Sequence, residues 1–404
     1  MELKKEKTYS HKNNFGGGIT EPGVQLENAL IYALETGSFH KINIVDRADA
    51  VCVFGLGAYF EDAFFKQNVK ERFRVSLLCD NSEKRLKEIE EKLESDSGLK
   101  CITPDCLPEY GNVAVILMLG DTRSAVRQLS PIVGPINCLA YNDLVLDEIM
   151  GGKRNRNWFA DEFENIRKGF ELLESEESKK IYVNVLCNRI ASHLSSQSYE
   201  EMCVLPQYFY EHEGYRLESR EVFVDCGAYT GDTLEEFLKL CSAGKDFSHA
   251  YAFELDKDNF WALNKWINQH GREISEKITV YNAGVWNENG GLNYGKMSSS
   301  DSFSIFNPRE TITAKTVRLD DVLMDKKVTL LKMDIEGAEK AALEGAAHII
   351  KTQKPKLAVC VYHRIEDLWQ IPIMLKSWVP EYSISIRHHA KWWVAETVCY
   401  AWIK

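Results

Sequence analysis

The sequence predicts an α/β protein with two Rossmann-like doubly wound sheets joined by a helical segment. Short apolar runs alternate with amphipathic stretches in both halves of the chain, which is typical of parallel sheets covered by helices on both faces. In each half, the first apolar run leads directly into a turn that contains glycine. A chain of 404 residues is also long enough for two domains with separate cores.

The first Rossmann-like unit is expected over residues 38–150, after a tail and lead-in over residues 1–37. Its clearest predicted strands are residues 50–54, 74–79 and 113–119. Ser82 follows the second strand and is expected to cap a helix, because a serine at this position accepts a hydrogen bond from the first helical turn.

The turn after the first strand matches only part of the dinucleotide-binding fingerprint. Gly55 and Gly57 occupy the first two glycine positions, and Asp80 lies where an acid that binds ribose is expected. Phe60 occupies the third glycine position, where a bulky side chain would push the helix away from the strand or require a different ligand. One interpretation is therefore a site for NAD or a nucleotide sugar, and the other is a structural or interaction domain that shares the fold.

A helical linker or cap is expected over residues 151–215, with a domain boundary near Gly151 and Gly152. Apolar residues recur there at spacings of three and four, which predicts helices between Trp158 and about Tyr210. The residues at 207–210 are mostly aromatic, and they either wall the site of the substrate or pack in the core.

The second unit is expected over residues 216–404. Its predicted strands are residues 222–224, 250–253, 278–281, 330–333, 356–362, 382–387 and 392–403. The last two strands have no helix between them, and such a closing pair is found at the edge of a class I methyltransferase sheet. Ligands of these sheets lie beyond the carboxyl ends of the strands.

The turn after the first strand of this unit is the most informative part of the chain. It runs from Asp225 to Thr233 with the spacing Asp-x-Gly-x-x-x-Gly, in which the glycines are Gly227 and Gly231. Glycine lets the backbone bend and lets a ligand approach closely, and the helix that follows offers its positive end. This spacing favours S-adenosylmethionine (SAM) over NAD, with Asp225 near the methionine part.

The next strand ends support the same interpretation. Glu254 ends the second strand, where an acid can accept hydrogen bonds from both ribose hydroxyls. Asn282 and Ala283 end the third strand and are expected at the adenine edge. The predicted cofactor-binding residues are Asp225, Gly227, Tyr229, Gly231, Asp232, Thr233, Glu254, Asn282 and Ala283.

Three further residues are expected to form the reaction face: Asp334 and Glu336 after the fourth strand, and His363 after the fifth. A hydroxyl acceptor must lose a proton during methyl transfer, and His363 is the leading candidate for the base, with Asp334 second. The same three side chains could bind Mg²⁺, Mn²⁺ or Zn²⁺. Alternatively, Glu336 and Glu339 serve the positive end of the next helix and Asp334 orients the substrate.

An insertion lies between the third and fourth strands. It begins with a turn at residues 287–291 and contains a polar cluster at Ser298–Ser302. This cluster is expected to form either a lid over the acceptor site or a solvated hairpin.

Five segments of the second half form a recognisable set: residues 224–233, 316–323, 331–339, 343–346 and 362–363. This set resembles the signature of the FkbM-type SAM-dependent methyltransferases over roughly residues 160–404. The resemblance implies methylation, usually of a hydroxyl oxygen, on sugars, glycan precursors or polyketide-like products. It does not name the acceptor, because a shared fold and cofactor do not determine a substrate.

Composition narrows the class of protein further. A formal charge of −11 argues against a nucleic-acid partner. No run approaches the roughly 18 apolar residues of a membrane span, and the N-terminus lacks the apolar core of a signal peptide. Eleven cysteines without a CxxC pair favour a reducing cytoplasm. A small-molecule or glycan-type acceptor is the expected partner, and a homo-oligomer remains possible.

Three alternatives stay open from sequence. The methyl acceptor is a nitrogen or carbon atom, or the protein is an NAD-linked enzyme acting through its first unit, or it is a non-catalytic SAM-binding scaffold.

Overall fold

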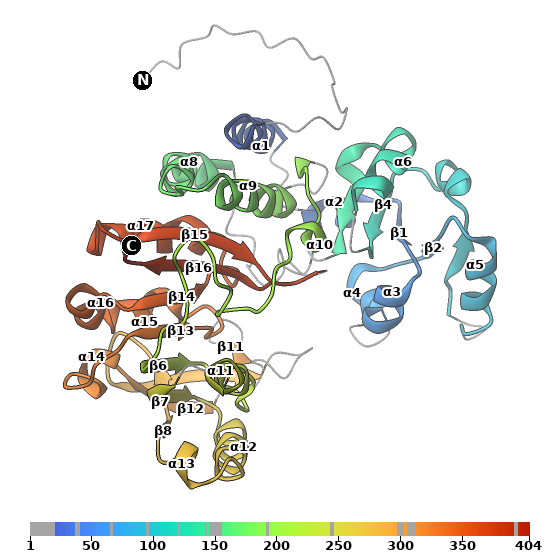
Figure 1. Ribbon diagram of the computed structural model, residues 1–404. Helices are drawn as coiled ribbons and strands as arrows, with labels where there is room; N and C mark the ends of the chain where they lie inside the picture. Colours follow the sequence, from blue (N-terminus) through green and yellow to red (C-terminus); the bar gives the residue numbers. More distant parts are fainter. Residues whose placement is uncertain are drawn as a thin grey trace, which may run out of the picture.

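The computed structural model describes residues 21–36, 41–64, 68–93, 97–119, 122–141, 144, 156–190, 194–242, 246–296, 303–304, 312–391 and 395–404. These residues form two lobes, and each lobe is built around its own sheet (Figure 1). The expected boundary at Gly151 and Gly152, the serine cluster at Ser298–Ser302 and the start of the last predicted strand at Trp392 lie outside the described residues.

The N-terminal sheet has five parallel strands in the order β3-β2-β1-β4-β5. The strands are β1 (Ala50–Phe54), β2 (Leu77–Cys79), β3 (Lys100–Ile102), β4 (Val113–Leu117) and β5 (Cys138–Ala140). The accompanying helices are α2 (Lys41–Arg47), α3 (Ala58–Ala63), α4 (Val69–Phe73), α5 (Glu83–Glu90), α6 (Arg123–Val133), η1 (Pro104–Tyr110) and η2 (Pro135–Asn137). Val51 and Val53 pack into the core on one face of the sheet, and Cys52 and Phe54 into the core on the other. The predicted Rossmann-like unit is therefore confirmed.

The predicted cap of α5 is also present. Ser82 Oγ accepts a hydrogen bond from the Arg85 N–H at 3.2 Å, which satisfies one of the free donors in the first turn.

The C-terminal sheet has seven strands in the order β15-β16-β14-β13-β6-β7-β8. They are β6 (Glu221–Cys226), β7 (Phe247–Glu254), β8 (Ile278–Asn282), β13 (Leu330–Met333), β14 (Lys356–Cys360), β15 (Ser383–His388) and β16 (Thr397–Trp402). The helices of this lobe are α11 (Asp232–Ser242), α12 (Lys257–Asn268), α13 (Arg272–Ser275), α14 (Leu319–Val322), α15 (Glu339–Glu344), α16 (Ala347–Gln353) and α17 (Asp367–Trp378). Five strands are parallel, and β16 runs antiparallel to both β14 and β15. The expected closing pair is confirmed.

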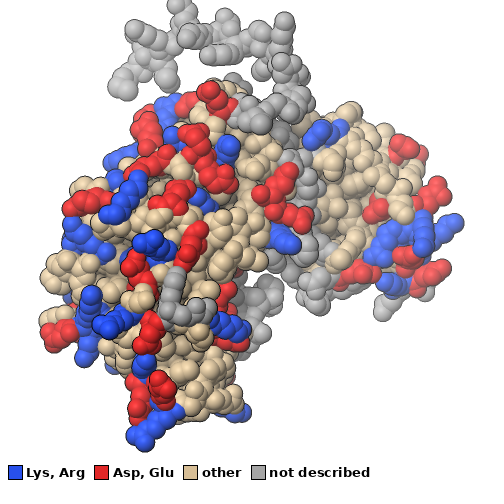
Figure 2. Space-filling view, in the orientation of Figure 1, with Lys and Arg blue, Asp and Glu red and all other residues tan. Residues whose placement is uncertain are grey.

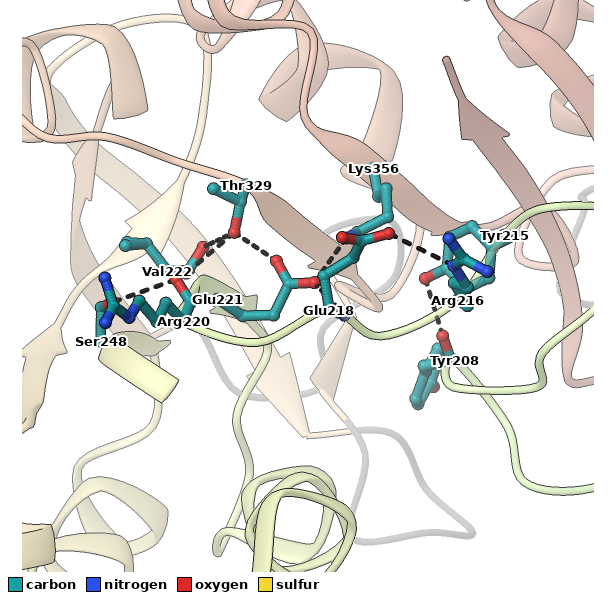
Figure 3. Close-up of polar contacts among 10 residues, drawn as sticks. All are labelled: Tyr208, Tyr215, Arg216, Glu218, Arg220, Glu221, Val222, Ser248, Thr329 and Lys356. Atoms are coloured by element: carbon teal, nitrogen blue, oxygen red, sulfur yellow. Dashed lines mark hydrogen bonds and ion pairs between the residues drawn. The ribbon is translucent and has the colours of Figure 1, made fainter. Parts of the chain in front are cut away.

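The amino ends of these strands are held by a buried glutamate. The Glu221 carboxylate pairs with Lys356 at the start of β14 and accepts a hydrogen bond from Thr329 Oγ1 (Figure 3). It also accepts the Glu218 N–H at 2.7 Å, and Thr329 Oγ1 accepts the Val222 N–H at 2.8 Å. Glu221 is only 2% exposed. Because these partners satisfy it fully, it ties three neighbouring strands together rather than offering a ligand site.

The helical segment packs on the C-terminal sheet. Its helices are α8 (Arg156–Glu171), α9 (Glu176–Ile190) and the short α10 (Tyr199–Met202). Ser178 Oγ of α9 accepts hydrogen bonds from the Ile386 N–H at 3.3 Å and from Arg387 Nη1 at 2.6 Å, both in β15. Helix α1 (Pro22–Thr36) lies within the expected tail and lead-in, yet Gln25 Nε2 donates to Asn184 Oδ1 of α9 at 3.0 Å. These helices therefore share the core of the second lobe.

The predicted helical stretch is wrong at its C-terminal end, because it stops at Met202 rather than near Tyr210. Cys203 forms a parallel bridge with His388, which draws the chain toward β15. Pro206 lacks a backbone N–H and cannot occupy a helix interior. Tyr208 adopts a positive φ of 63°, which a helix does not allow. The segment after α10 is consequently a loop that runs along the sheet.

A small sheet with the order β11-β10-β12-β9 is inserted between β8 and β13. Its strands are β9 (Gly284–Val285), β10 (Gly290–Lys296), β11 (Phe303–Ser304) and β12 (Ile312–Val317). Among the described helices, none combines the length and apolar character that a membrane crossing needs.

Candidate active site

A cavity of about 400 Å³ lies at the carboxyl ends of β6, β7, β8 and β13. Six of the predicted cofactor-binding residues line it, namely Gly227, Tyr229, Asp232, Thr233, Glu254 and Ala283. Asp334 and Glu336 of the predicted reaction face line it as well. Asp225, Gly231, Asn282 and His363 lie outside its wall. The strand-end position that the sequence predicts is therefore hollow, as ligand sites of open parallel sheets are.

Both glycines of the turn after β6 are required by close approach. Gly227 has a φ of 81°, and a Cβ atom there would lie 1.9 Å from the Asp334 carbonyl oxygen. Gly231 has a φ of 104°, and its Cβ would lie 2.9 Å from Leu263 Cδ1 of α12. Gly227 thus lets β6 turn beside the end of β13, whereas Gly231 lets α11 begin against α12.

Asp225 is fully buried and pairs with a lysine that the sequence analysis did not single out. Its Oδ1 lies 2.9 Å from Lys332 Nζ, which also donates to the Gly227 carbonyl at 2.8 Å. Burial raises the pKa of Asp225 to about 6, although the lysine charge opposes the rise. Burial would lower the pKa of Lys332, but the charges of Asp225 and Asp334 hold it above its usual value. Asp225 therefore supports the glycine turn through Lys332, and Lys332 itself lines the cavity.

Glu254 connects the loop after β6 to the loop after β7 at one end of the cavity. Its Oε2 accepts the Tyr229 N–H and its Oε1 accepts the Asp256 N–H, each at 2.8 Å. Burial raises the pKa of Glu254 to about 7. Asn282 Nδ2 donates to the carbonyls of Glu254 at 3.0 Å and Leu255 at 3.2 Å, so Asn282 fixes the backbone around this carboxylate.

Asp334 lies at the opposite end of the cavity from Glu254, between two tyrosines. Its Oδ2 accepts the Tyr208 hydroxyl at 2.7 Å, and its Oδ1 accepts the Tyr362 hydroxyl at 3.0 Å. Burial would raise the pKa of Asp334, but the charges of His363 and Lys332 hold it below its ordinary value. Asp334 is therefore an ionised hydrogen-bond acceptor at the cavity wall.

His363 lies behind this wall among three carboxylates. Its Nδ1 is 2.8 Å from Glu339 Oε1, and its Nε2 is 3.4 Å from Glu336 Oε2 and 3.6 Å from Asp334 Oδ1. Burial would lower the pKa of His363, but Glu339 and Glu336 raise it well above its ordinary value. The ring thus carries both protons in this state, and a role as base would require that it first lose one.

The same cluster contains the donor set for a cation. One donor atom each from Asp334, Glu339 and His363 lie within 4.8 Å of one another. Glu339 is fully buried, and its Oε1 also accepts the Ile335 N–H at 2.9 Å. Glu339 thus takes the place of Glu336 in the predicted metal set. Two carboxylates and an imidazole are ligand types that suit Mn²⁺, Zn²⁺ or Mg²⁺, and His363 would have to release a proton to bind one.

Four polar residues of the cavity wall near Asp334 were not among the predicted site residues. Gln207 and Tyr208 line the cavity, and Tyr208 and Phe209 pack in the core, so the expected core packing of this aromatic stretch is confirmed for these two residues. Glu396 lies just before β16, and its carboxylate accepts a hydrogen bond from Gln207 Nε2. Burial raises the pKa of Glu396 to about 7. Lys332 is the fourth, and its charge within an otherwise apolar strand is the sequence feature that could have identified it.

The N-terminal turn is filled by its own lobe. Asp80 Oδ2 accepts the Leu56 N–H and its Oδ1 accepts the Ser82 N–H, each at 2.9 Å. Arg85 Nε donates to the Leu56 carbonyl at 2.6 Å. Phe60 is fully buried and stacks on Phe64 with ring centroids 4.6 Å apart. The position of the third fingerprint glycine is thus part of the core.

Gly55 and Gly57 differ in what surrounds them. Gly55 has a φ of 93°, and a Cβ atom there would lie 2.5 Å from Leu119 Cδ2. A Cβ atom at Gly57 would meet no atom within 4 Å. The close approach at Gly55 is therefore to a side chain of the same lobe.

The strand order and the strand-end cavity define the second lobe as a class I methyltransferase fold. More particularly, residues 225–387 match the family model of the methyltransferase FkbM domain. Residues 225–387 of the second lobe are therefore a methyltransferase domain of the FkbM family, as the sequence motifs indicated.

A solved structure shares the fold of this chain. The chain is similar to methyltransferase FkbM from Methylobacillus flagellatus KT, with 22% identity, coverage of 94% of this chain and 99% of that chain, and a TM-score of 0.66. This similarity therefore includes both lobes. No curated protein matches the chain.

Two smaller enzymes match only part of the chain. An rRNA methylase from Streptococcus thermophilus covers 46% of this chain and 90% of its own, at 10% identity and a TM-score of 0.29. Precorrin-6y C5,15-methyltransferase from Geobacter metallireducens GS-15 covers 47% and 83%, at 14% identity and a TM-score of 0.28. At these scores the two similarities add nothing to the assignment.

Proposed function

We propose that the FkbM domain transfers the methyl group of SAM to a hydroxyl oxygen of a sugar, a glycan precursor or a related metabolite. The observation that carries the proposal is the cavity, because it joins the glycine turn and Glu254 to a wall that carries the carboxyl groups of Asp334, Glu336 and Glu396. SAM supplies an electrophilic methyl group, and acceptors at the opposite wall suit a hydroxyl that must be oriented and deprotonated.

The cofactor end of the cavity is the part that contains Glu254. Glu254, Asp256 and Asn259 offer carboxylate and amide groups there, with Ala283 beside them. Carboxylate oxygens retain free lone pairs after accepting one N–H each, so Glu254 can still accept ribose hydroxyls. Gly227 leaves the backbone open on the methionine side, and Asp232 and Thr233 begin α11 there.

The acceptor end contains Asp334 and Glu336. Tyr208 and Tyr362 fix both oxygens of Asp334, so the direction of its remaining lone pairs is set by two hydroxyls and not by solvent. A preset orientation of this kind lowers the entropy cost of placing an acceptor hydroxyl against the methyl group. Asp334, Glu339 and His363 are the residues that would hold a divalent ion, which would supply Lewis-acid chemistry for deprotonating a hydroxyl.

Surface charge supports the proposed type of acceptor, and the free thiols support a cytoplasmic location. On the face in Figure 2, the described Lys and Arg side chains of the second lobe are interspersed with Asp and Glu. This distribution favours a small or glycan-type acceptor over a nucleic acid. All eleven cysteines are free thiols, which supports a reducing compartment such as the cytoplasm.

The proposal is tested first by calorimetric titration of SAM, S-adenosylhomocysteine and NAD into the full chain. We expect one site for S-adenosylhomocysteine, and a loss of tenfold or more in its affinity (about 1.4 kcal/mol) in Glu254→Ala. Asp80→Ala is the matched variant in the other lobe, and we expect it to leave the affinity for S-adenosylhomocysteine unchanged. NAD binding that Asp80→Ala abolishes would instead favour an enzyme that acts through the first lobe.

The second step is turnover. Release of S-adenosylhomocysteine with neutral methyl glycosides, and a methoxy signal in the product by NMR, would support O-methylation. Methylated nitrogen or carbon would redirect the proposal to another acceptor atom. Tight cofactor binding with no turnover on the whole glycoside panel would favour a non-catalytic scaffold.

A further inference from the structure

The cavity is lined by an unusual number of residues with a strained backbone. Nine non-glycine residues among the described ones have a positive φ, and four of them line this single cavity. They are Tyr208 at 63°, Tyr229 at 47°, Glu336 at 56° and Glu396 at 65°. Of the other five, Arg74 and Lys354 end helices, where this conformation is common, and Asn68 is an asparagine, which tolerates it better than most residues. Strained conformations that gather at one cavity are a mark of a functional site, because packing must hold them there.

Glu396 is the least explained of these four by the fold alone. Its carbonyl oxygen accepts the His389 N–H at 2.9 Å, so the backbone is part of the β15–β16 connection. Its carboxylate accepts a hydrogen bond from Gln207 Nε2 and, among the described residues, has no other hydrogen bond and no ion pair. Glutamate is a poor choice for this conformation, since a glycine would adopt it without strain. A structural role does not require the carboxylate, whereas a ligand at the cavity would.

The charges around Glu396 indicate which ligand. Asp334, Glu336 and Glu396 are all carboxylates at this end of the cavity. Lys332 is the one described cation that lines the cavity, and Asp225 already pairs with it at 2.9 Å. A phosphate or carboxylate on the acceptor would lie among these carboxyl groups, of which Asp334 is ionised, and would be repelled by the charge there. Hydroxyl groups, in contrast, donate hydrogen bonds that carboxylates accept strongly.

We propose that Glu396, held by Gln207, is the residue that binds the acceptor hydroxyl, and that the acceptor is an uncharged, hydroxyl-rich molecule. The inference rests on the proposed O-methylation. The hydroxyl oxygen forms a bond to the methyl carbon as the bond from that carbon to the sulfonium sulfur breaks. The hydroxyl proton passes to the Glu396 carboxylate, and S-adenosylhomocysteine leaves with the bonding electron pair on sulfur.

Glu396→Gly tests this role against a structural one. Glycine removes the carboxylate and relieves the positive φ, so we expect an unchanged or raised melting temperature and S-adenosylhomocysteine affinity within twofold of wild type. Transfer from SAM to neutral methyl hexopyranosides, measured as release of S-adenosylhomocysteine, is expected to fall at least 100-fold. Glu396→Gln keeps the shape and the Gln207 contact, and it should restore binding of the glycoside more than turnover. The 6-phosphates of the same glycosides should react at least tenfold more slowly with wild type.

Arg220→Gly is the matched control. Arg220 is exposed, has a φ of 64°, and lies before β6 at the opposite end of the sheet (Figure 3). Its replacement should leave turnover unchanged. Full turnover in Glu396→Gly, or a preference for the phosphorylated glycosides, would overturn this inference and leave the proposed function standing. No turnover by wild type on the panel would count against the proposed function, and the inference would fail with it.

Discussion

The two glycine turns of this chain are built in the same way. In the N-terminal lobe, Asp80 at the end of β2 accepts the N–H of Leu56 in the turn after β1 and the N–H of Ser82. In the C-terminal lobe, Glu254 at the end of β7 accepts the N–H of Tyr229 in the turn after β6 and the N–H of Asp256. A glycine turn and an acid on the next strand therefore brace a Rossmann-like fold at both places, whether or not a ligand binds.

What surrounds the two turns differs. At the first, Arg85 bonds to the Leu56 carbonyl and Phe60 is fully buried, so side chains of the lobe occupy the turn. At the second, a buried Asp225–Lys332 pair holds the turn from beneath, and a cavity of about 400 Å³ opens above it. The comparison teaches that the glycine–acid pattern marks the turn, and that the neighbouring strands decide whether the turn faces a cavity.

The largest expected effect comes from breaking the support of the second turn. Lys332→Met leaves the Asp225 charge buried without its partner, which typically costs about 3–5 kcal/mol. We expect this loss in the free energy of unfolding, measured by urea denaturation. The double variant Lys332→Met, Asp225→Leu should recover most of it, because no buried charge then remains unpaired.

Lys92→Met is the counterpart in the first lobe. Lys92 pairs with Glu61 at 2.7 Å on the surface, so its loss should not change stability measurably. Equal effects in the two lobes would show that the buried pair does not support the second turn as we describe.

A smaller effect is expected from pH. The pKa of Glu254 is raised to about 7 by burial, so the carboxylate becomes protonated as the pH falls through neutrality. If the ionised form binds the ribose hydroxyls, affinity for S-adenosylhomocysteine is complete above the pKa and is lost below it. A pKa of about 7 predicts a loss of about tenfold between pH 8 and pH 6.

Calorimetry at several pH values measures this dependence. Glu254→Gln is the control, because it cannot titrate and should bind with a flatter pH profile. An unchanged slope in this variant would assign the pH dependence to another group.

The sequence predicted both sheets because buried parallel strands are continuous apolar runs, as Val113–Leu117 and Leu330–Met333 are. It predicted much of the cavity because a glycine turn such as Gly227 and a strand-end acid such as Glu254 are local patterns. The pairing of Lys332 with Asp225 could not be read from sequence. It depends on β13 lying beside β6 in the register that aligns these two residues.

Glu396 carried no local signal. It reaches the cavity because β16 runs antiparallel to β14, which brings the amino end of the last strand to the carboxyl edge of the sheet. The aromatic stretch at 207–210 was ambiguous for a similar reason. Tyr208 faces Asp334 only because its backbone leaves the helical region at a positive φ.

Hydrogen exchange measured by mass spectrometry, with and without S-adenosylhomocysteine, tests the central claim most directly. The claim is that only the second glycine turn serves a ligand. We predict slower exchange at residues 227–233 and 254–259, and unchanged exchange at residues 55–60 and 80–85. Slower exchange at the first turn, or none at the second in a sample that binds S-adenosylhomocysteine, would contradict it.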